Sequence, residues 1–120
     1  MASGARAQRV AQRILEELSE VVLFEVTDPR LEGIFITDVK VDRELAYANI
    51  YVSALEGAER QPEIMQGLAS ASGFLRSRLA VRVQLRSVPQ LRFNWDPTPE
   101  HAEHIDKLLD SLKKDKKDDE

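Results

Sequence analysis

The chain has 120 residues, with 17 lysines and arginines against 21 aspartates and glutamates, which gives a formal net charge of −4. It has no cysteine, which excludes a disulfide scaffold, a thiolate metal site and a cysteine nucleophile. Hydrophobic residues make up 42% of the chain, enough for one packed core at this length. No apolar run is long enough to form a membrane helix, and the first residues lack the apolar stretch of a secretory signal. We therefore expect one cytoplasmic domain that does not contact a membrane.

The first predicted element is a helix over residues 6 to about 26, preceded by a flexible start over residues 1–5. Apolar residues recur there at spacings of three and four, which is typical of one buried helix face. That face comprises Val10, Ile14, Leu18, Val21 and Val22. Pro29 disfavours helical geometry in the residue before it, so we expect a turn from Asp28 to Gly33.

Two strands are predicted next, over residues 34–42 and 46–55, because apolar and polar residues alternate along both. The short link Arg43–Leu45 suits an antiparallel hairpin. In the first strand, one face would carry Phe35, Thr37, Val39 and Val41. In the second, the small residues of one face indicate a helix packed closely above it; this face comprises Ala46, Ala48, Ile50, Val52 and Ala54.

Two short helices are predicted over residues 62–71 and from Phe74 to about Arg82, joined by a kink at Ala71–Ser72–Gly73. The alternative is a single long helix, since one glycine costs a helix interior only about 1 kcal/mol relative to alanine. A strand follows from Val88 to Trp95, and Pro89 places it at a sheet edge or at a bulge. A last helix is expected from Pro99 to about Lys113, followed by a disordered charged tail over residues 114–120.

The predicted order is thus helix, strand, strand, helix, kink, helix, strand, with a terminal helix. The connection between the second and third strands has the length of a crossover, which makes those two strands parallel. The sequence therefore predicts an α+β domain over residues 6–96, with a three-stranded mixed sheet covered by helices on one face. Residues 97–113 would form a helical extension.

Positive charge is concentrated in one segment, residues 71–95, which contains five arginines and no acidic residue. Arginine offers a planar fork that suits phosphate oxygens and also stacks on bases. The segment is therefore either a phosphate-binding surface or a surface whose acidic partners come from elsewhere in the fold. The five are Arg76, Arg78, Arg82, Arg86 and Arg92.

Several strings in this order resemble the ribosome-binding factor A family. They lie in the first helix (Arg9–Ala11), after it (Asp28–Leu31), in the second strand (Ala46–Ala48, Tyr51–Ser53), at the predicted kink (Ala71–Ser77) and at the third strand (Val88–Phe93). The resemblance runs from about Arg6 to Leu112. It implies a type II KH-like domain in which an Ala-x-Gly kink, here Ala71–Ser72–Gly73, replaces the usual GxxG loop.

The resemblance also implies a function: binding of the immature small (30S) ribosomal subunit and its 16S rRNA precursor. It further implies a role in late maturation and 5′-end processing of that rRNA, a role in cold adaptation, and no catalytic activity or cofactor. A ribosome-assembly GTPase is a further expected partner, and the chain is expected to be monomeric.

From the residues themselves, we expect backbone N–H groups at the kink to face a phosphate beside a cluster of arginines. The predicted RNA-binding residues are Ala71, Ser72, Gly73, Arg76, Arg78, Arg82, Arg86 and Arg92, extended by Arg6, Arg9 and Arg13. Gly73 has a packing role as its alternative explanation. Whether Tyr47 or Tyr51 stacks on bases stays open at this point.

The rival function is that of a protein-interaction adaptor whose arginine-rich surface docks an acidic partner. A metal site is not expected, since His101 and His104 alone do not make one. The sequence contains no nucleotide-binding or nucleophile motif, so no set of residues in it supports an enzymatic function. Phe74, Phe93 and Trp95 are expected in the core because of their apolar spacing.

Overall fold

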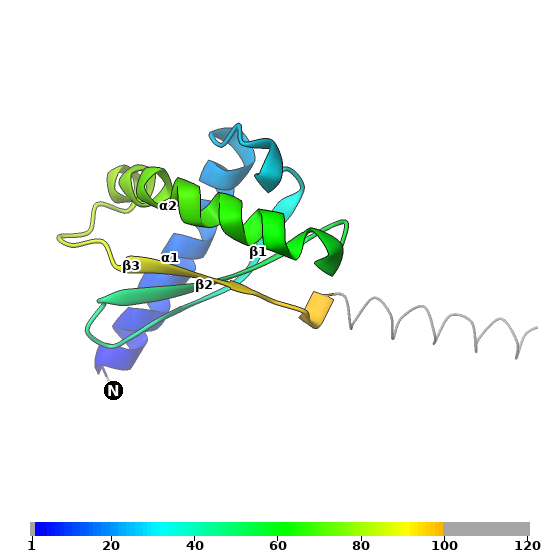
Figure 1. Ribbon diagram of the computed structural model, residues 1–120. Helices are drawn as coiled ribbons and strands as arrows, with labels where there is room; N and C mark the ends of the chain where they lie inside the picture. The colour runs from blue at the N-terminus through cyan, green and yellow to red at the C-terminus, as the bar shows by residue number, and fades with distance from the viewer. Residues whose placement is uncertain (1, 100–120) are drawn as a thin grey trace, which may run out of the picture.

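The computed structural model describes residues 2–99, and Figure 1 shows the path of the chain. Helix α1 (Ala2–Phe24) begins at Ala2, so the predicted flexible start over residues 1–5 is helical from its second residue. The predicted helix from Pro99 to Lys113 lies, except for its first residue, outside the described residues. The charged tail over residues 114–120 also lies outside them.

Helix α1 buries the predicted apolar stripe, since Ile14, Leu18 and Val21 are fully buried. The expected turn contains a short 3-10 helix, η1 (Pro29–Leu31). Asp28 caps it: the carboxylate accepts the backbone N–H of Arg30 at 2.9 Å and pairs with the Arg30 guanidinium at 2.7 Å. The hydrogen bonds from Arg30 hold the pKa of Asp28 below its usual value.

The predicted hairpin is confirmed as an antiparallel pair, β1 (Ile34–Val41) and β2 (Tyr47–Ala54). Its turn depends on Asp42, whose carboxylate accepts the backbone N–H groups of Ala46 and Tyr47, each at 2.8 Å. Leu45 adopts a left-handed backbone, with a φ of 57°. These two features explain how the chain turns without the Asn-Gly or Asp-Gly pair that favours tight hairpins.

A β-bulge in β1 corrects the predicted alternation of that strand. The register shifts between Ile36, which pairs with Val52, and Asp38, which pairs with Tyr51. The extra residue moves the following side chains to the other face. Ile34 therefore faces the core before the bulge and Val39 after it, while Phe35 is exposed.

The strand order is β1-β2-β3, and β3 (Gln90–Trp95) runs parallel to β2, as predicted for a crossover. The inner face of β2, with Ala48, Ile50 and Val52 buried, packs in one core with residues of both α1 and α2. The expected core positions of Phe93 and Trp95 are confirmed, whereas Phe74 is 47% exposed. The α+β class with a three-stranded mixed sheet, in a KH-like fold, is thus confirmed.

The two short helices predicted on either side of Gly73 lie within one continuous helix, α2 (Gln61–Val83), so the stated alternative of a single long helix is the one found. Its buried residues keep one helical stripe through the small residues: Ile64, Leu68, Leu75 and Leu79. Gly73 lies within this helix and does not have a positive φ. The continuous apolar stripe is the physical reason that one helix forms, because the core contact outweighs the cost of one glycine.

Candidate RNA-binding surface

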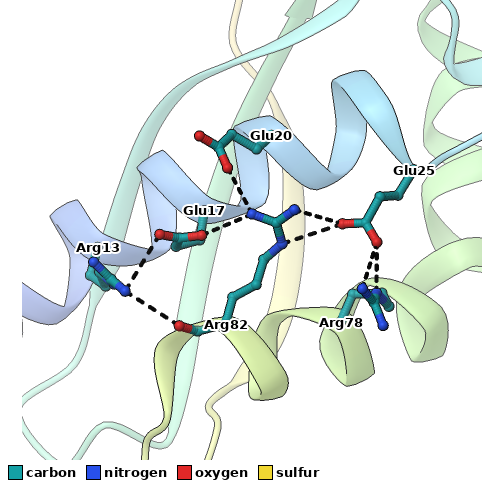
Figure 2. A network of polar contacts seen from close by, with 6 residues as sticks. All are labelled: Arg13, Glu17, Glu20, Glu25, Arg78 and Arg82. Carbon is teal, nitrogen blue, oxygen red and sulfur yellow. Dashed lines mark hydrogen bonds and ion pairs between the residues drawn. The ribbon is translucent and has the colours of Figure 1, made fainter.

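The structure separates the predicted arginines, and Arg78 and Arg82 are held against α1. The Arg82 guanidinium pairs with Glu17 at 3.0 Å, Glu20 at 2.7 Å and Glu25 at 2.9 Å, as Figure 2 shows. Arg78 pairs with the other oxygen of Glu25 at 2.7 Å. These charges do have acidic partners, from α1 and from Glu25 directly after it, so neither arginine belongs to the proposed RNA surface.

The hydrogen bonds of this network shift the pKa values of Arg82 and Glu25. The hydrogen bonds that Arg82 donates to Glu17, Glu20 and Glu25 raise the pKa of Arg82 above its ordinary value. Partial burial acts to raise the pKa of Glu25, but the hydrogen bonds from Arg82 and Arg78 outweigh it, so the pKa lies below its ordinary value. The network therefore consists of permanent charges at neutral pH, and it joins α1 to α2.

A shallow hollow of about 510 Å³ lies on the other side of α2. Gly73, Ser77 and Ala80 line it from one face of the helix, because they follow one another at spacings of four and three. Ser87 and Val88 close it from the loop that leads to β3. Arg78 and Arg82 lie about 140° and about 180° around the helix from Gly73 at 3.6 residues per turn, so they face away from it.

Arg76 brings a charge to this hollow and also shapes it. Its guanidinium donates to the backbone carbonyls of Val88 at 2.7 Å and Pro89 at 3.2 Å, which fixes the loop against α2. Within residues 2–99, no carboxylate lies within ion-pairing distance of Arg76. The positive charge of Arg76 is therefore available to a phosphate group that enters the hollow.

Arg86 lies in the same loop and is exposed. On α1, Arg6 and Arg9 are also exposed, and neither these two nor Arg86 pairs with an acid in the described part of the chain. Arg13 pairs with Glu17 at 3.5 Å and donates to the backbone carbonyl of Arg82 at 3.3 Å. Arg13 therefore belongs to the network of Figure 2.

Arg92 lies on the sheet face opposite the core, where its guanidinium stacks over the ring of Tyr47 at 3.7 Å from the ring centre. Tyr47 is 41% exposed, and Lys40 lies over the ring of Tyr51, 5.5 Å from its centre. Arg92 thus takes part in a cation–aromatic pair on a different face from the hollow. A core position for Tyr47 is excluded.

The expected helix N-terminus at Gly73 is absent, since Gly73 lies inside α2 and its N–H group belongs to the helix. The small residues still have a role: a Cβ atom placed on Gly73 would meet nothing within 4 Å. Close packing therefore does not explain why position 73 is a glycine. What the glycine does provide is a smooth, open helix surface. Ala71 and Ser72 are half-buried beside it.

Sequence reasoning missed the three other small residues of the hollow, Ser77, Ala80 and Ser87. Their spacing from Gly73 would have indicated Ser77 and Ala80 once a continuous helix was assumed. It also missed Gly67, where an added Cβ would lie 2.9 Å from Leu31 Cδ2 and 3.1 Å from Arg30 Cβ. Gly67, and not Gly73, is the glycine that allows close packing.

Two further features concern residues 2–99, the part of the chain that the structure describes. No group of three or more metal-ligating side chains gathers among those residues. None of the helices described there is both long enough and apolar enough to span a bilayer.

Comparison with known proteins gives the family. Residues 6–109 match the family model described as ribosome-binding factor A. A relative of that name from Alcanivorax borkumensis is 45% identical over 109 residues, covering 90% of this chain and 80% of its own.

Two structural neighbours carry the same name. The crystal structure of ribosome-binding factor A from Thermus thermophilus superposes with a TM-score of 0.66 at 25% identity, over 74% of this chain and 93% of its own. A homology model of the Thermus thermophilus protein, fitted into a cryo-EM map of its complex with the 30S subunit, has a TM-score of 0.58 at 26% identity and covers 69% and 87% of the two chains. The fold, the family model and the 45% identical relative agree: the chain belongs to the ribosome-binding factor A family.

Proposed function

We propose that this chain is a cytoplasmic, non-catalytic assembly factor that binds the small ribosomal subunit through its rRNA. The observation that carries the proposal is the hollow beside Gly73, where an unobstructed helix surface adjoins two arginines without acidic partners among the described residues. Arg76 supplies charge there, and Arg86 directly precedes Ser87 of the lining. Ser77 and Ser87 supply hydroxyl groups that can bond phosphate or ribose oxygens. The Thermus thermophilus relative fitted into the 30S map supports the same partner.

The proposed contact is with single-stranded or loop RNA. A smooth helix surface allows the sugar–phosphate chain to approach the backbone closely, whereas ordinary KH domains clamp four nucleotides with a GxxG loop. Here Gly73 and Ala80 provide that surface within one continuous helix. Arg6 and Arg9 would extend the contact along α1, while Ala71 and Ser72 would shape its border.

The test compares two charge-reversal variants, one next to the hollow and one on a different face of the molecule. Arg86→Glu should weaken binding to purified small subunits by about tenfold, since it removes one charge-assisted phosphate contact. Lys40→Glu, on the face of the sheet opposite the core, is the matched control and should leave the affinity within twofold. Both positions are exposed, so thermal unfolding should match that of the unsubstituted chain.

Equal losses for the two variants would mean that only bulk charge matters, and would contradict a site at the hollow. The rival adaptor function is decided by RNase treatment of the complex. An RNA-bound factor is released by the nuclease, whereas an adaptor retains its acidic protein partner.

The finer roles belong to the same proposal. We infer that the bound chain assists late folding and 5′-end processing of the 16S rRNA precursor, that this matters most in the cold, and that a ribosome-assembly GTPase acts with it. A monomer suffices for the proposed contact. Accumulation of unprocessed 16S rRNA at low temperature in cells that carry Arg86→Glu would support these roles, and normal processing would contradict them.

A further inference from the structure

A hollow of about 820 Å³ lies at the C-terminal end of α1, away from the predicted arginines. It is lined by the last turn of α1, by the turn through η1, and by the residues where β1 begins and β2 ends. Its apolar lining includes Val22, Leu23, Val26, Leu31, Phe35 and Leu55.

Several of these side chains are exposed to an extent that folding does not explain. Leu55 is 82% exposed, Leu23 is 71% exposed and Phe35 is 37% exposed, and neighbouring Phe24 is 74% exposed. Single exposed apolar residues are common on protein surfaces, but a contiguous group around a concavity marks an interaction site. Three of the seven large exposed hydrophobic residues of the described chain line this hollow, and a fourth, Phe24, directly follows Leu23 in the sequence.

Charge around the hollow identifies the kind of partner. Asp28 and Glu32 line it, and Glu56 follows Leu55 directly. The nearby cations are already neutralised, since Arg30 pairs with Asp28 at 2.7 Å and Arg60 pairs with Glu63 at 2.7 Å. Glu32 has no ion pair within residues 2–99, and Glu56 reaches Arg60 only at 3.7 Å. The rim is therefore net negative, which repels RNA phosphates.

We propose that this hollow, which we call the α1-end groove, binds a basic polypeptide segment with apolar side chains. Leucine- or phenylalanine-sized anchors would fill the space between Leu23, Phe35 and Leu55, while lysine or arginine side chains would pair with Glu32 and Glu56. The inference rests on the proposed function in one respect. On a particle made of RNA and protein, a surface that rejects phosphate can accept the RNA-binding proteins, which are themselves rich in lysine and arginine.

The first experiment needs no ribosome. A short fluorescein-labelled peptide of alternating leucine and lysine pairs is titrated into the full chain, beside one with glutamate for lysine and one with serine for leucine. We expect saturable binding of the first peptide only. Leu23→Ser combined with Leu55→Ser should weaken it by about tenfold, as expected for losing two apolar anchors.

Matched controls separate the groove from general stickiness. Val81→Ser removes an apolar side chain that is 66% exposed on α2, outside the groove, and should leave peptide affinity unchanged. Glu32→Lys should weaken binding, whereas Glu44→Lys, in the hairpin at the opposite end of β1, should not. Equal binding of the lysine and glutamate peptides, or an effect of Val81→Ser equal to that of the groove variant, would overturn the proposal.

The second experiment uses the small subunit itself. A photo-reactive benzoylphenylalanine at position 55 is irradiated in the sedimented complex, and the adduct is identified by mass spectrometry. A crosslink to a lysine- and arginine-rich protein segment supports the groove. A crosslink to RNA, to a second copy of this chain, or no crosslink in a chain that co-sediments would overturn it. Failure to co-sediment would instead count against the proposed function, and the peptide titration would still decide the groove.

Discussion

Gly67 and Gly73 lie on one helix and have opposite surroundings. At Gly67 a Cβ atom would press on Leu31, which is itself buried against the core, and on the Cβ of Arg30. At Gly73 the space is empty to 4 Å. Gly67 thus allows the close contact between α2 and η1. Gly73 destabilises the helix and makes no packing contact that would compensate for this.

The two alanine variants should therefore shift stability in opposite directions. Gly73→Ala should raise the free energy of unfolding by about 0.5–1 kcal/mol, since alanine restricts the unfolded chain and favours the helix. Gly67→Ala gains the same preference but adds an overpacking cost of about 1–3 kcal/mol, so a net loss is expected. Chemical denaturation of both variants measures this. A destabilised Gly73→Ala chain would indicate a packing partner for Gly73 and would weaken the proposed function.

The sequence singled out Gly73 and passed over Gly67 for a physical reason. A glycine among small residues near a cluster of arginines is visible along the chain. The neighbours of Gly67 come from η1, more than thirty residues earlier, and that approach exists only after the chain has folded.

At the scale of elements, α1 and α2 are joined by charges that lie far apart in the sequence. The carboxylates that pair with Arg82 precede it by 57 to 65 residues. A segment that is purely basic in sequence is therefore partly neutral in the fold. For this reason the predicted arginines do not form one site. Residues 71–95 do contain five arginines and no acidic residue, but which of these arginines face solvent depends on the rotation of α2 about its axis.

Glu25 makes this network dependent on pH, and the sign follows from its pKa. Because the pKa in the folded chain lies below the ordinary value of 4.5, the ion pairs stabilise the fold at neutral pH. That contribution is lost as the pH falls through the folded-state pKa of Glu25. Glu25→Gln should thus lower the melting temperature by a few degrees at neutral pH, and the difference from the unsubstituted chain should narrow as the solution is acidified well below 4.5. A constant difference across that range would contradict the assignment.

Arg82→Met tests whether the network is structural. Methionine keeps much of the aliphatic stem that packs between the helices but leaves Glu17, Glu20 and Glu25 without their shared cation. The melting temperature at neutral pH should fall by a few degrees, while affinity for small subunits, compared at a temperature where both chains are folded, should stay within twofold. A large loss of affinity with unchanged melting would return Arg82 to the RNA surface.

For the strands, too, some features could be predicted from the sequence and others could not. The hairpin, the parallel third strand and the inner face of β2 follow from alternation and connection length, which are local properties of the chain. The bulge between Ile36 and Asp38 does not, since the residues on either side continue to alternate in sequence. The bulge appears only in the register against β2, and it lets Ile34 and Val39 both face the core while Phe35 lines the α1-end groove.

At the scale of the whole molecule, the net charge of −4 conceals two regions of different chemistry. Arg76, Arg86, Arg6 and Arg9 are cations without acidic partners among residues 2–99, while the α1-end groove is apolar with an acidic rim. A chain of this kind cannot attach to RNA by bulk charge. Attachment requires a particular orientation, with these arginines towards phosphate and the groove free for protein.

The salt dependence of small-subunit binding measures how many phosphates are contacted. If Arg6, Arg9, Arg76 and Arg86 each neutralise one phosphate of single-stranded RNA, log K should fall against log salt with a slope of roughly −3. Arg86→Glu should make that slope shallower by about 0.7, because one counterion fewer is released, whereas Lys40→Glu should not change it. A slope near zero would mean that protein contacts, such as those proposed for the groove, carry the binding alone. A slope several times steeper would mean that cations now assigned to ion pairs, Arg78 and Arg82 first among them, turn outward on the ribosome.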